Sequence, residues 1–156
     1  MNREDYQMEY NVDFGDMPSG PFLLGLLSTF DNRYQAIADM FFEDITWKQF
    51  FAIICINLCK TPPSINELAD IMGSSHQNVK QILLKLEKRE FVRIVVDEED
   101  RRKQRVFTTQ KCRRFCEDNE SESNRIIGRI FDGISEEEIN TTIQTISKME
   151  RNVKSL

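Results

Sequence analysis

The side chains best suited to chemistry in this chain form two clusters, a polar run that begins at Ser74 and a cationic group that ends at Lys103. Hydroxyl, amide and imidazole groups exchange hydrogen bonds with base edges, and Lys and Arg neutralise phosphates. These residue types point to recognition of nucleic acid rather than to a reaction. The residues expected to contact double-stranded DNA are Ser64, Ser74, Ser75, His76, Gln77, Asn78, Lys80, Gln81, Lys85, Arg101, Arg102 and Lys103.

Charge is distributed unevenly along the 156 residues. The net charge of −5 would by itself argue against a polyanionic partner. Residues 74–114, however, hold 12 Lys or Arg and 6 Asp or Glu, whereas the rest of the chain carries a net charge of −11. Because phosphates respond to the potential within a Debye length, roughly 8 to 10 Å, the basic segment can bind DNA. The alternative is a solvated helix followed by a charged loop.

Motifs that would make the chain an enzyme are missing from the sequence. There is no glycine-rich phosphate loop, no GxSxG nucleophile elbow and no HExxH metal motif. His76 is the only histidine, which excludes a zinc site built from several histidines. We therefore expect no catalysis, no cofactor and no metal. His76 is interpreted as a DNA contact at a helix N-terminus or as a solvated surface residue.

The four cysteines form two pairs, Cys55 with Cys59 and Cys112 with Cys116. The spacing of four residues places both thiols of a pair on one face of a helix. Redox sensing or a thiolate metal site would use such a pair. Each pair nevertheless lies within an apolar stripe, and reduced cysteine is among the most buried residue types, so the sequence favours packing.

Four Ser or Thr residues are followed three positions later by Glu or Gln, the pattern of a capping box at a helix start. The pairs are Thr46 with Gln49, Ser64 with Glu67, Ser74 with Gln77, and Ser135 with Glu138. Apolar residues recur at spacings of three and four between these starts, which predicts helices. The predicted helices cover residues 21–42, 46–58, 65–72, 74–89 and 110–131 and a last segment that begins at Ser135.

The centre of the chain has the pattern of a winged helix-turn-helix. Gly73 separates two short predicted helices, and a residue with positive φ allows a sharp turn there. The second of these helices has an apolar stripe of Val79, Ile82, Leu83 and Leu86. Residues 91–96 and 104–109 then read as two strands around a charged tip at 97–102. The expected fold is mainly α, with a small β-hairpin wing and long flanking helices.

The flanking helices carry more apolar surface than a winged-helix core can cover, which predicts a homodimer. The interface is expected to include Leu23, Leu27, Phe30, Ile126, Ile130, Ile139, Ile143 and Ile146. A helical bundle within one chain is the alternative. Residues 20–45 and 110–156 would thus form the dimerisation region and residues 46–109 the DNA-binding domain. Residues 1–19 are interpreted as a frayed, flexible arm or a short helix packed on the partner subunit.

A membrane location is not expected from this sequence. No apolar run approaches the roughly 20 residues that a bilayer requires. The first 19 residues are acidic, whereas a signal peptide would be basic and then apolar. We expect a cytoplasmic protein.

Residues 64–109 resemble the MarR family of transcriptional regulators. The resemblance is carried by the segment from Asn66 to Gly73, by Ser74–Leu86 with the following Glu-Lys-Arg, and by the wing from Asp97 to Thr109. The order of the predicted helices extends it to about residues 21–153. The resemblance implies a homodimer whose two recognition helices enter successive major grooves of a pseudo-palindromic operator, roughly 34 to 36 Å apart.

The same resemblance implies roles for the wing. Asp100 and Arg102 match the family's Asp and Arg, one of which stabilises the tip while the other, or neighbouring Arg101, reaches the minor groove. It also implies a candidate small-molecule effector in the pocket between the dimer helices and the reading domain. The expected function is a sequence-specific regulator of transcription, most often a repressor in this family. The alternative is a winged-helix module that binds another protein without specific DNA binding.

Two features depart from the family pattern. Glu90 stands where a Gly often follows the recognition helix, so it must avoid the left-handed conformation or absorb about 1 kcal/mol of strain. Gln77, Asn78 and Lys80 stand where small hydroxyl residues are commoner, so the base preference of this chain is expected to be its own.

Overall fold

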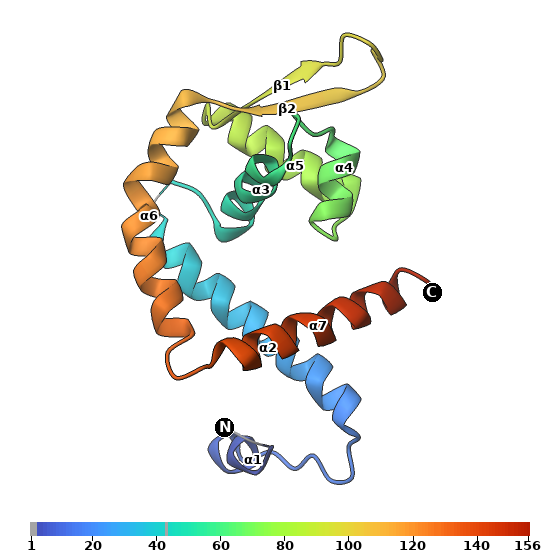
Figure 1. Ribbon diagram of the computed structural model, residues 1–156, viewed down its shortest axis with the longest axis vertical. Coiled ribbons are helices and arrows are strands. Elements are labelled where there is room, and N and C mark those ends of the chain that lie inside the picture. Colours follow the sequence, from blue (N-terminus) through green and yellow to red (C-terminus); the bar gives the residue numbers. More distant parts are fainter. Residues whose placement is uncertain (1–2, 43) are drawn as a thin grey trace. The chain divides into compact units, whose positions relative to one another are not determined.

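The computed structural model describes residues 3–42 and 44–156, and these residues form helices and one two-stranded hairpin (Figure 1). The elements are α1 (Arg3–Tyr10), α2 (Ser19–Phe41), α3 (Trp47–Leu58), α4 (Ile65–Ile71), α5 (His76–Lys88), β1 (Val92–Val96), β2 (Gln104–Thr108), α6 (Gln110–Ile130) and α7 (Glu136–Val153). The predicted fold class, a mainly helical winged helix-turn-helix, is confirmed.

Three of the predicted capping boxes are present, and each sets the start of its helix. They pair Thr46 with Gln49 at α3, Ser64 with Glu67 at α4, and Ser135 with Glu138 at α7. In each box the hydroxyl accepts the third amide of the helix while the longer side chain accepts the amide of the cap itself. The starts of these three helices could therefore be read from the sequence to within one residue.

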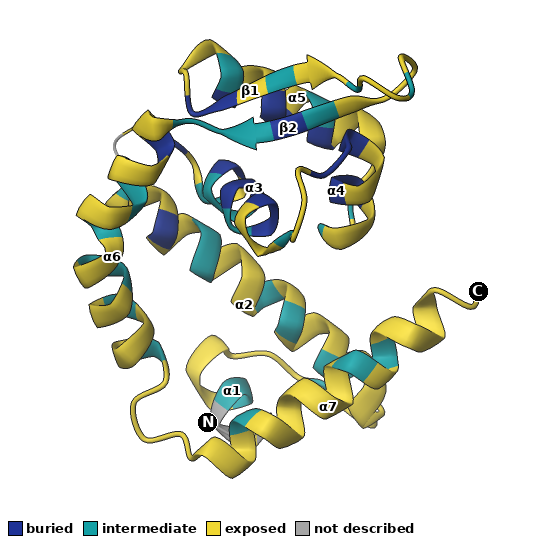
Figure 2. Cartoon of the chain, turned by 45° about the horizontal axis from the view of Figure 1, so that its top comes forward, coloured by how far each residue is buried: buried dark blue, intermediate teal, exposed yellow. Residues whose placement is uncertain are grey.

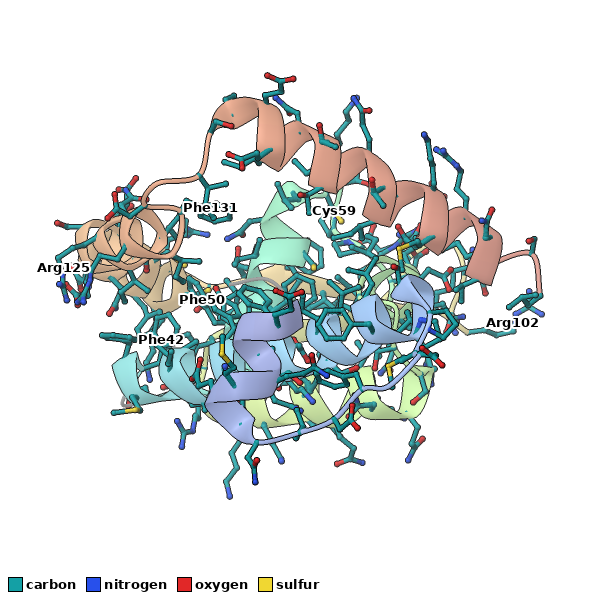
Figure 3. The ribbon with its side chains drawn as sticks, turned by 90° about the horizontal axis from the view of Figure 1, so that it is seen from below. Phe42, Phe50, Cys59, Arg102, Arg125 and Phe131 are labelled. Atoms are coloured by element: carbon teal, nitrogen blue, oxygen red, sulfur yellow. The ribbon has the colours of Figure 1, made fainter. Side chains whose placement is uncertain are left out.

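The buried core lies where α3, α4, α5 and the hairpin pack together (Figure 2). The predicted apolar stripe of α5 is confirmed, because all four of its residues are buried. Ile53 of α3, Leu68 of α4 and Phe91 before β1 complete the centre of this core. At the corner between α2 and α3, the rings of Phe42 and Phe50 lie 4.5 Å apart (Figure 3). The core fixes α5 by one face and leaves its other face free.

The turn between α4 and α5 is built around Gly73, which has a φ of 58°. This is the left-handed region that glycine enters without the steric penalty of a Cβ. The amide of Ser74 donates to the Ala69 carbonyl at 3.0 Å and closes the turn. The helix-turn-helix predicted from this glycine is confirmed.

The wing is an antiparallel hairpin in which Val92 pairs with Thr108 and Val96 with Gln104. Its second strand is also joined to the start of α4. Ser64 forms an isolated bridge with Arg105, and the Val106 amide donates to the Pro63 carbonyl at 2.9 Å. The wing is therefore attached to the helix-turn-helix through the backbone of residues 63–64.

The N-terminal segment contains the short helix α1, and aromatic side chains of this segment gather against α2. The rings of Tyr6 and Phe22 lie 6.3 Å apart, and those of Phe14 and Phe22 lie 5.1 Å apart. Arg33 donates to the Tyr10 hydroxyl at 2.7 Å and lies over its ring. Of the two predicted states of the arm, the structure shows the short helix, here in contact with α2 of the same chain.

The chain divides into two compact units, residues 1–109 and 110–156. The second unit consists of α6 and α7, and α7 has no buried residue (Figure 2). Within the described residues, none of the helices combines the length and the apolar character needed to cross a bilayer.

Candidate nucleic-acid interface

The polar face of α5 is displayed to solvent because the opposite face is anchored in the core. Lys80 is half-buried, and the remaining predicted contact residues of this helix are exposed. They are Ser75, His76, Gln77, Asn78, Gln81 and Lys85. Most of these side chains lie in the first two turns, where a recognition helix contacts bases.

The N-terminal cap of α5 is Ser75, so the prediction of a capping box from Ser74 to Gln77 is wrong. The Ser75 hydroxyl accepts the Asn78 amide at 3.2 Å. The Ser74 hydroxyl instead accepts the Asn78 side-chain amide at 2.9 Å. The turn around Gly73 carries Ser74 out of the cap position, and this backbone path cannot be read from the spacing of two side chains.

The tip of the wing is organised by two aspartates. Asp97 Oδ1 accepts the amides of Glu99 and Asp100 at 2.9 and 2.8 Å. Asp100 Oδ1 accepts both the amide and the Nε of Arg102, at 3.1 and 3.2 Å. The backbone amide and guanidinium of Arg102 hold the pKa of Asp100 below its usual value. The predicted partners Asp100 and Arg102 are thus in contact.

The cations at the tip extend into solvent. The Arg102 side chain is 91% exposed, and Figure 3 shows it at the margin of the view. Arg101 and Lys103 are also exposed, and the Lys103 ammonium lies 3.7 Å from Asp100. Exposed guanidinium and ammonium groups of this kind are suited to binding a polyanion.

Arg105 is an important residue of this region that the sequence prediction missed. Its Nε donates to Asp97 Oδ2 at 2.5 Å, and its Nη1 contacts Glu67 Oε2 at 3.1 Å and the Pro62 carbonyl at 3.2 Å. Hydrogen bonds from Arg105 and from the tip amides lower the pKa of Asp97 to about 2. The one signal available in the sequence was the position of Arg105 in the second predicted strand, between polar Gln104 and apolar Val106.

Ser64 is not brought to this surface. It is 8% exposed, and its hydroxyl accepts the Glu67 amide at 3.2 Å as the cap of α4. A side chain committed to capping cannot turn outward without leaving that amide unpaired. Ser64 therefore serves as the cap of α4 in this structure.

A cleft of about 430 Å³ lies beside the start of α5, within residues 1–109. Tyr34 and Trp47 form part of its wall, with ring centroids 4.6 Å apart, and Lys48 adds a cation. Burial raises the pKa of Tyr34, so its phenol keeps a proton that it can donate. Ser74 and Asn78 also line the cleft, which connects it directly to the polar face of α5.

The cysteine pairs have the environment of packed thiols. Cys55 and Cys112 are buried, whereas Cys59 and Cys116 are half-buried. Burial raises the pKa of Cys112 to about 12 and also raises that of Cys116. A protonated thiol is a poor nucleophile and metal ligand, which supports the packing interpretation. Within residues 3–42 and 44–156, no group of three or more His, Cys, Asp or Glu could hold a metal ion.

The residues predicted for a dimer interface lie on α2, α6 and α7 with different exposure. Phe30, Ile143 and Ile146 are exposed at 54%, 56% and 40%. The half-buried members are Leu23, Leu27, Ile126, Ile130 and Ile139. Large apolar side chains left in water in this way are typical of surfaces that bind another protein.

Comparison with known proteins agrees with this architecture. The structure of a MarR/EmrR family transcriptional regulator from Acinetobacter sp. ADP1 matches with a TM-score of 0.79 at 14% identity, covering 90% of this chain and 100% of that one. A MarR protein from Peptoclostridium difficile matches at 0.76 with 22% identity, covering 92% of each chain. The Staphylococcus aureus MepR–DNA complex matches at 0.73 with 21% identity, covering 82% and 95%. The chain is thus a winged-helix protein.

The sequence of the central region is similar to that of a known family. The MarR family model matches residues 45–103, which span α3 to the tip of the wing. The match confirms the resemblance to the MarR family noted in the sequence.

Proposed function

We propose that this protein is a sequence-specific, double-stranded DNA-binding regulator of transcription that acts as a repressor. The observation that carries the proposal is the exposed polar start of α5 together with the exposed cations of the wing, both fixed to one buried core. The similar fold of MepR, which was solved in complex with DNA, supports the proposal. Binding, rather than catalysis, is the chemistry that these side chains offer.

In this proposal the two parts of the surface have different tasks. His76, Gln77 and Asn78, with Ser75, Gln81 and the partly covered Lys80, contact base edges from the major groove. Arg101, Arg102 and Lys103 enter the adjacent minor groove, where a narrow groove attracts a guanidinium. Lys85 lies farther along α5 and contacts phosphate.

We further propose that two copies bind a pseudo-palindromic operator as a homodimer. The exposed apolar side chains of α2, α6 and α7 support this, because association would remove them from water. Symmetry would then place one α5 in each of two half-sites about one helical turn apart, roughly 34 to 36 Å.

A selection of bound sequences from a random DNA pool, followed by titration at several salt concentrations, tests the proposal. We expect one palindromic consensus, and we expect the affinity to fall by orders of magnitude between 50 and 200 mM salt. Binding that is equal on selected and scrambled duplexes would contradict a specific regulator. Absence of any duplex binding would favour the alternative, a module that recognises an acidic protein.

Single substitutions distinguish residues that contact phosphates from residues that recognise bases. Arg102→Ala should weaken binding to every duplex by a similar factor, whereas Gln77→Ala should change the preference among duplexes. Arg125→Ala removes one charge from α6, outside the proposed surface, and serves as the matched control. Equal losses on matched and scrambled DNA for Gln77→Ala would exclude that residue from base reading.

Ligand response is proposed for the cleft beside α5. Its aromatic wall and Lys48 suit a planar aromatic anion, and an occupant would contact Ser74 and Asn78. Trp47 is the only tryptophan of the chain and lines the cleft, so its fluorescence reports binding directly. Titration with an aromatic carboxylate should quench this fluorescence and release DNA, and Lys48→Ala should weaken both effects. Quenching that persists unchanged in Lys48→Ala would contradict this assignment.

A further inference from the structure

We infer that Arg105 is a positioning residue that locks the wing onto the helix-turn-helix, so that Arg102 and α5 reach one duplex in a fixed relative geometry. The inference rests on the proposed DNA-binding function. It concerns a residue that lies outside the proposed contact surface and would act through other groups.

On one side the Arg105 guanidinium holds the tip of the wing. Its Nε donates to Asp97 Oδ2 at 2.5 Å, and the Asp97 side chain is only 10% exposed. The other oxygen of Asp97 accepts the amides of Glu99 and Asp100. Asp100 in turn contacts Arg102, so a chain of hydrogen bonds leads from Arg105 to the cation at the tip.

On the other side the same guanidinium holds the start of α4. Its Nη1 lies 3.1 Å from Glu67 Oε2 and 3.2 Å from the Pro62 carbonyl. Glu67 Oε2 also accepts the Ser64 amide at 2.6 Å as part of the capping box. Arg105 thereby connects the wing to the first helix of the helix-turn-helix through groups that are already ordered.

The planar guanidinium suits this task because its fixed fork of donors can reach acceptors on two segments at once. A lysine keeps the charge but presents a single ammonium group, which cannot reproduce the fork. With its donors directed at protein acceptors, Arg105 would act on DNA affinity by holding the wing in place before binding. Such preorganisation lowers the conformational cost of association.

A double-mutant cycle on the selected operator tests the inference. Arg105→Ala should lower affinity about tenfold in the wild-type chain but less than about twofold in the Arg102→Ala chain, because the wing it positions has then lost its contact. Additive losses would overturn the inference, since they would mean that Arg105 acts directly or through global stability. Urea denaturation of each variant identifies any loss of the folded state.

Two further variants sharpen the cycle. Arg93→Ala removes one exposed cation from the same hairpin, where Arg93 lies 5.7 Å from the centre of the Phe107 ring. The change in operator affinity caused by Arg93→Ala should be the same in the wild-type and Arg102→Ala chains. Arg105→Lys keeps the charge and should retain the salt dependence while losing most of the coupling to Arg102. Coupling as strong as in the wild type would overturn the role of the fork.

Hydrogen exchange without DNA separates this inference from the proposed function. Arg105→Ala should accelerate exchange at the amides of Glu99 and Asp100 while leaving the core of α5 protected. Unchanged exchange at these amides would overturn the inference even if the protein binds DNA. If the wild-type chain binds no duplex, the proposed function fails, and the exchange measurement still decides whether Arg105 holds the wing.

Discussion

Glu90 shows how one residue accommodates a conformation that its side chain disfavours. It follows α5 with a φ of 64°, and the Phe91 amide donates to the Leu86 carbonyl at 2.9 Å in the pattern of a Schellman motif. The Thr109 hydroxyl donates a hydrogen bond to the Glu90 carbonyl at 2.6 Å. The sequence left open whether Glu90 would avoid the left-handed region, and the structure shows that it does not.

Glu90→Gly should therefore stabilise the protein by about 0.5 to 1 kcal/mol, the left-handed penalty less the greater chain entropy of glycine. The midpoint of urea unfolding measures the change. Glu90→Ala is the matched control, because it removes the charge but keeps the Cβ. Equal stability of the two variants would show that φ does not limit stability at this position.

Asp97 makes the stability of the wing dependent on acid. Its pKa is lowered from 3.8 to about 2 by the hydrogen bonds from Arg105 and the tip amides. A lowered pKa in the folded state means that the carboxylate stabilises the fold at neutral pH and that this contribution is lost as pH falls from about 4 to about 2.

Asp97→Asn should flatten the fall in unfolding free energy over this pH window, and Arg105→Ala should do the same because it removes the main cause of the shift. Urea denaturation at intervals between pH 2 and pH 6 provides the measurement. A slope identical to that of the wild type in both variants would contradict the role of this pair.

At the scale of elements, the start of α5 differs from its expected form. The sequence pattern predicts Ser74 as the N-cap of α5. In the structure Ser75 is the N-cap, and the Ser74 hydroxyl accepts a hydrogen bond from the Asn78 side-chain amide. The choice affects the reading surface, because the cap determines where the first turn of α5 begins.

Ser75→Ala should destabilise the protein by about 1 kcal/mol, the usual cost of losing an N-cap hydroxyl. Ser74→Ala should cost clearly less, since its hydroxyl satisfies an exposed side chain rather than a helix amide. Urea unfolding of the two single variants compares them directly. A larger loss of unfolding free energy for Ser74→Ala than for Ser75→Ala would support the capping box predicted from the sequence.

At the scale of the whole molecule, the chain is acidic overall but has one basic segment, and several of its helices expose large apolar side chains. Ile143, Ile146 and Val153 of α7 are exposed at 56%, 40% and 66%. In the proposed dimer these side chains would be shielded from water.

Ile143→Glu should convert the protein from a dimer to a monomer of 18.4 kDa, because a carboxylate would be buried without a partner. Sedimentation velocity measures the mass, and operator affinity should fall with it. Gln144→Glu adds the same charge at the next position of α7 and should leave the dimer intact. A wild-type chain that sediments as a monomer at all concentrations would contradict the dimer.

The sequence by itself determined the features that depend on neighbours a few residues apart. Helix starts such as Thr46 and Ser135, the buried stripe of α5 and the sharp turn at Gly73 follow from spacings of three and four and from the freedom of one glycine. These effects act within one or two helical turns, so a linear pattern captures them.

Tertiary structure alone decided the contacts between distant parts of the chain. Arg105 meets Glu67 and Pro62 across 38 and 43 positions, and Arg33 meets Tyr10 across 23. The burial of Ser64 and the shift of the cap to Ser75 also depend on how the backbone passes between packed elements. Such contacts arise only after packing has brought elements distant in the sequence together, so no local spacing in the sequence encodes them.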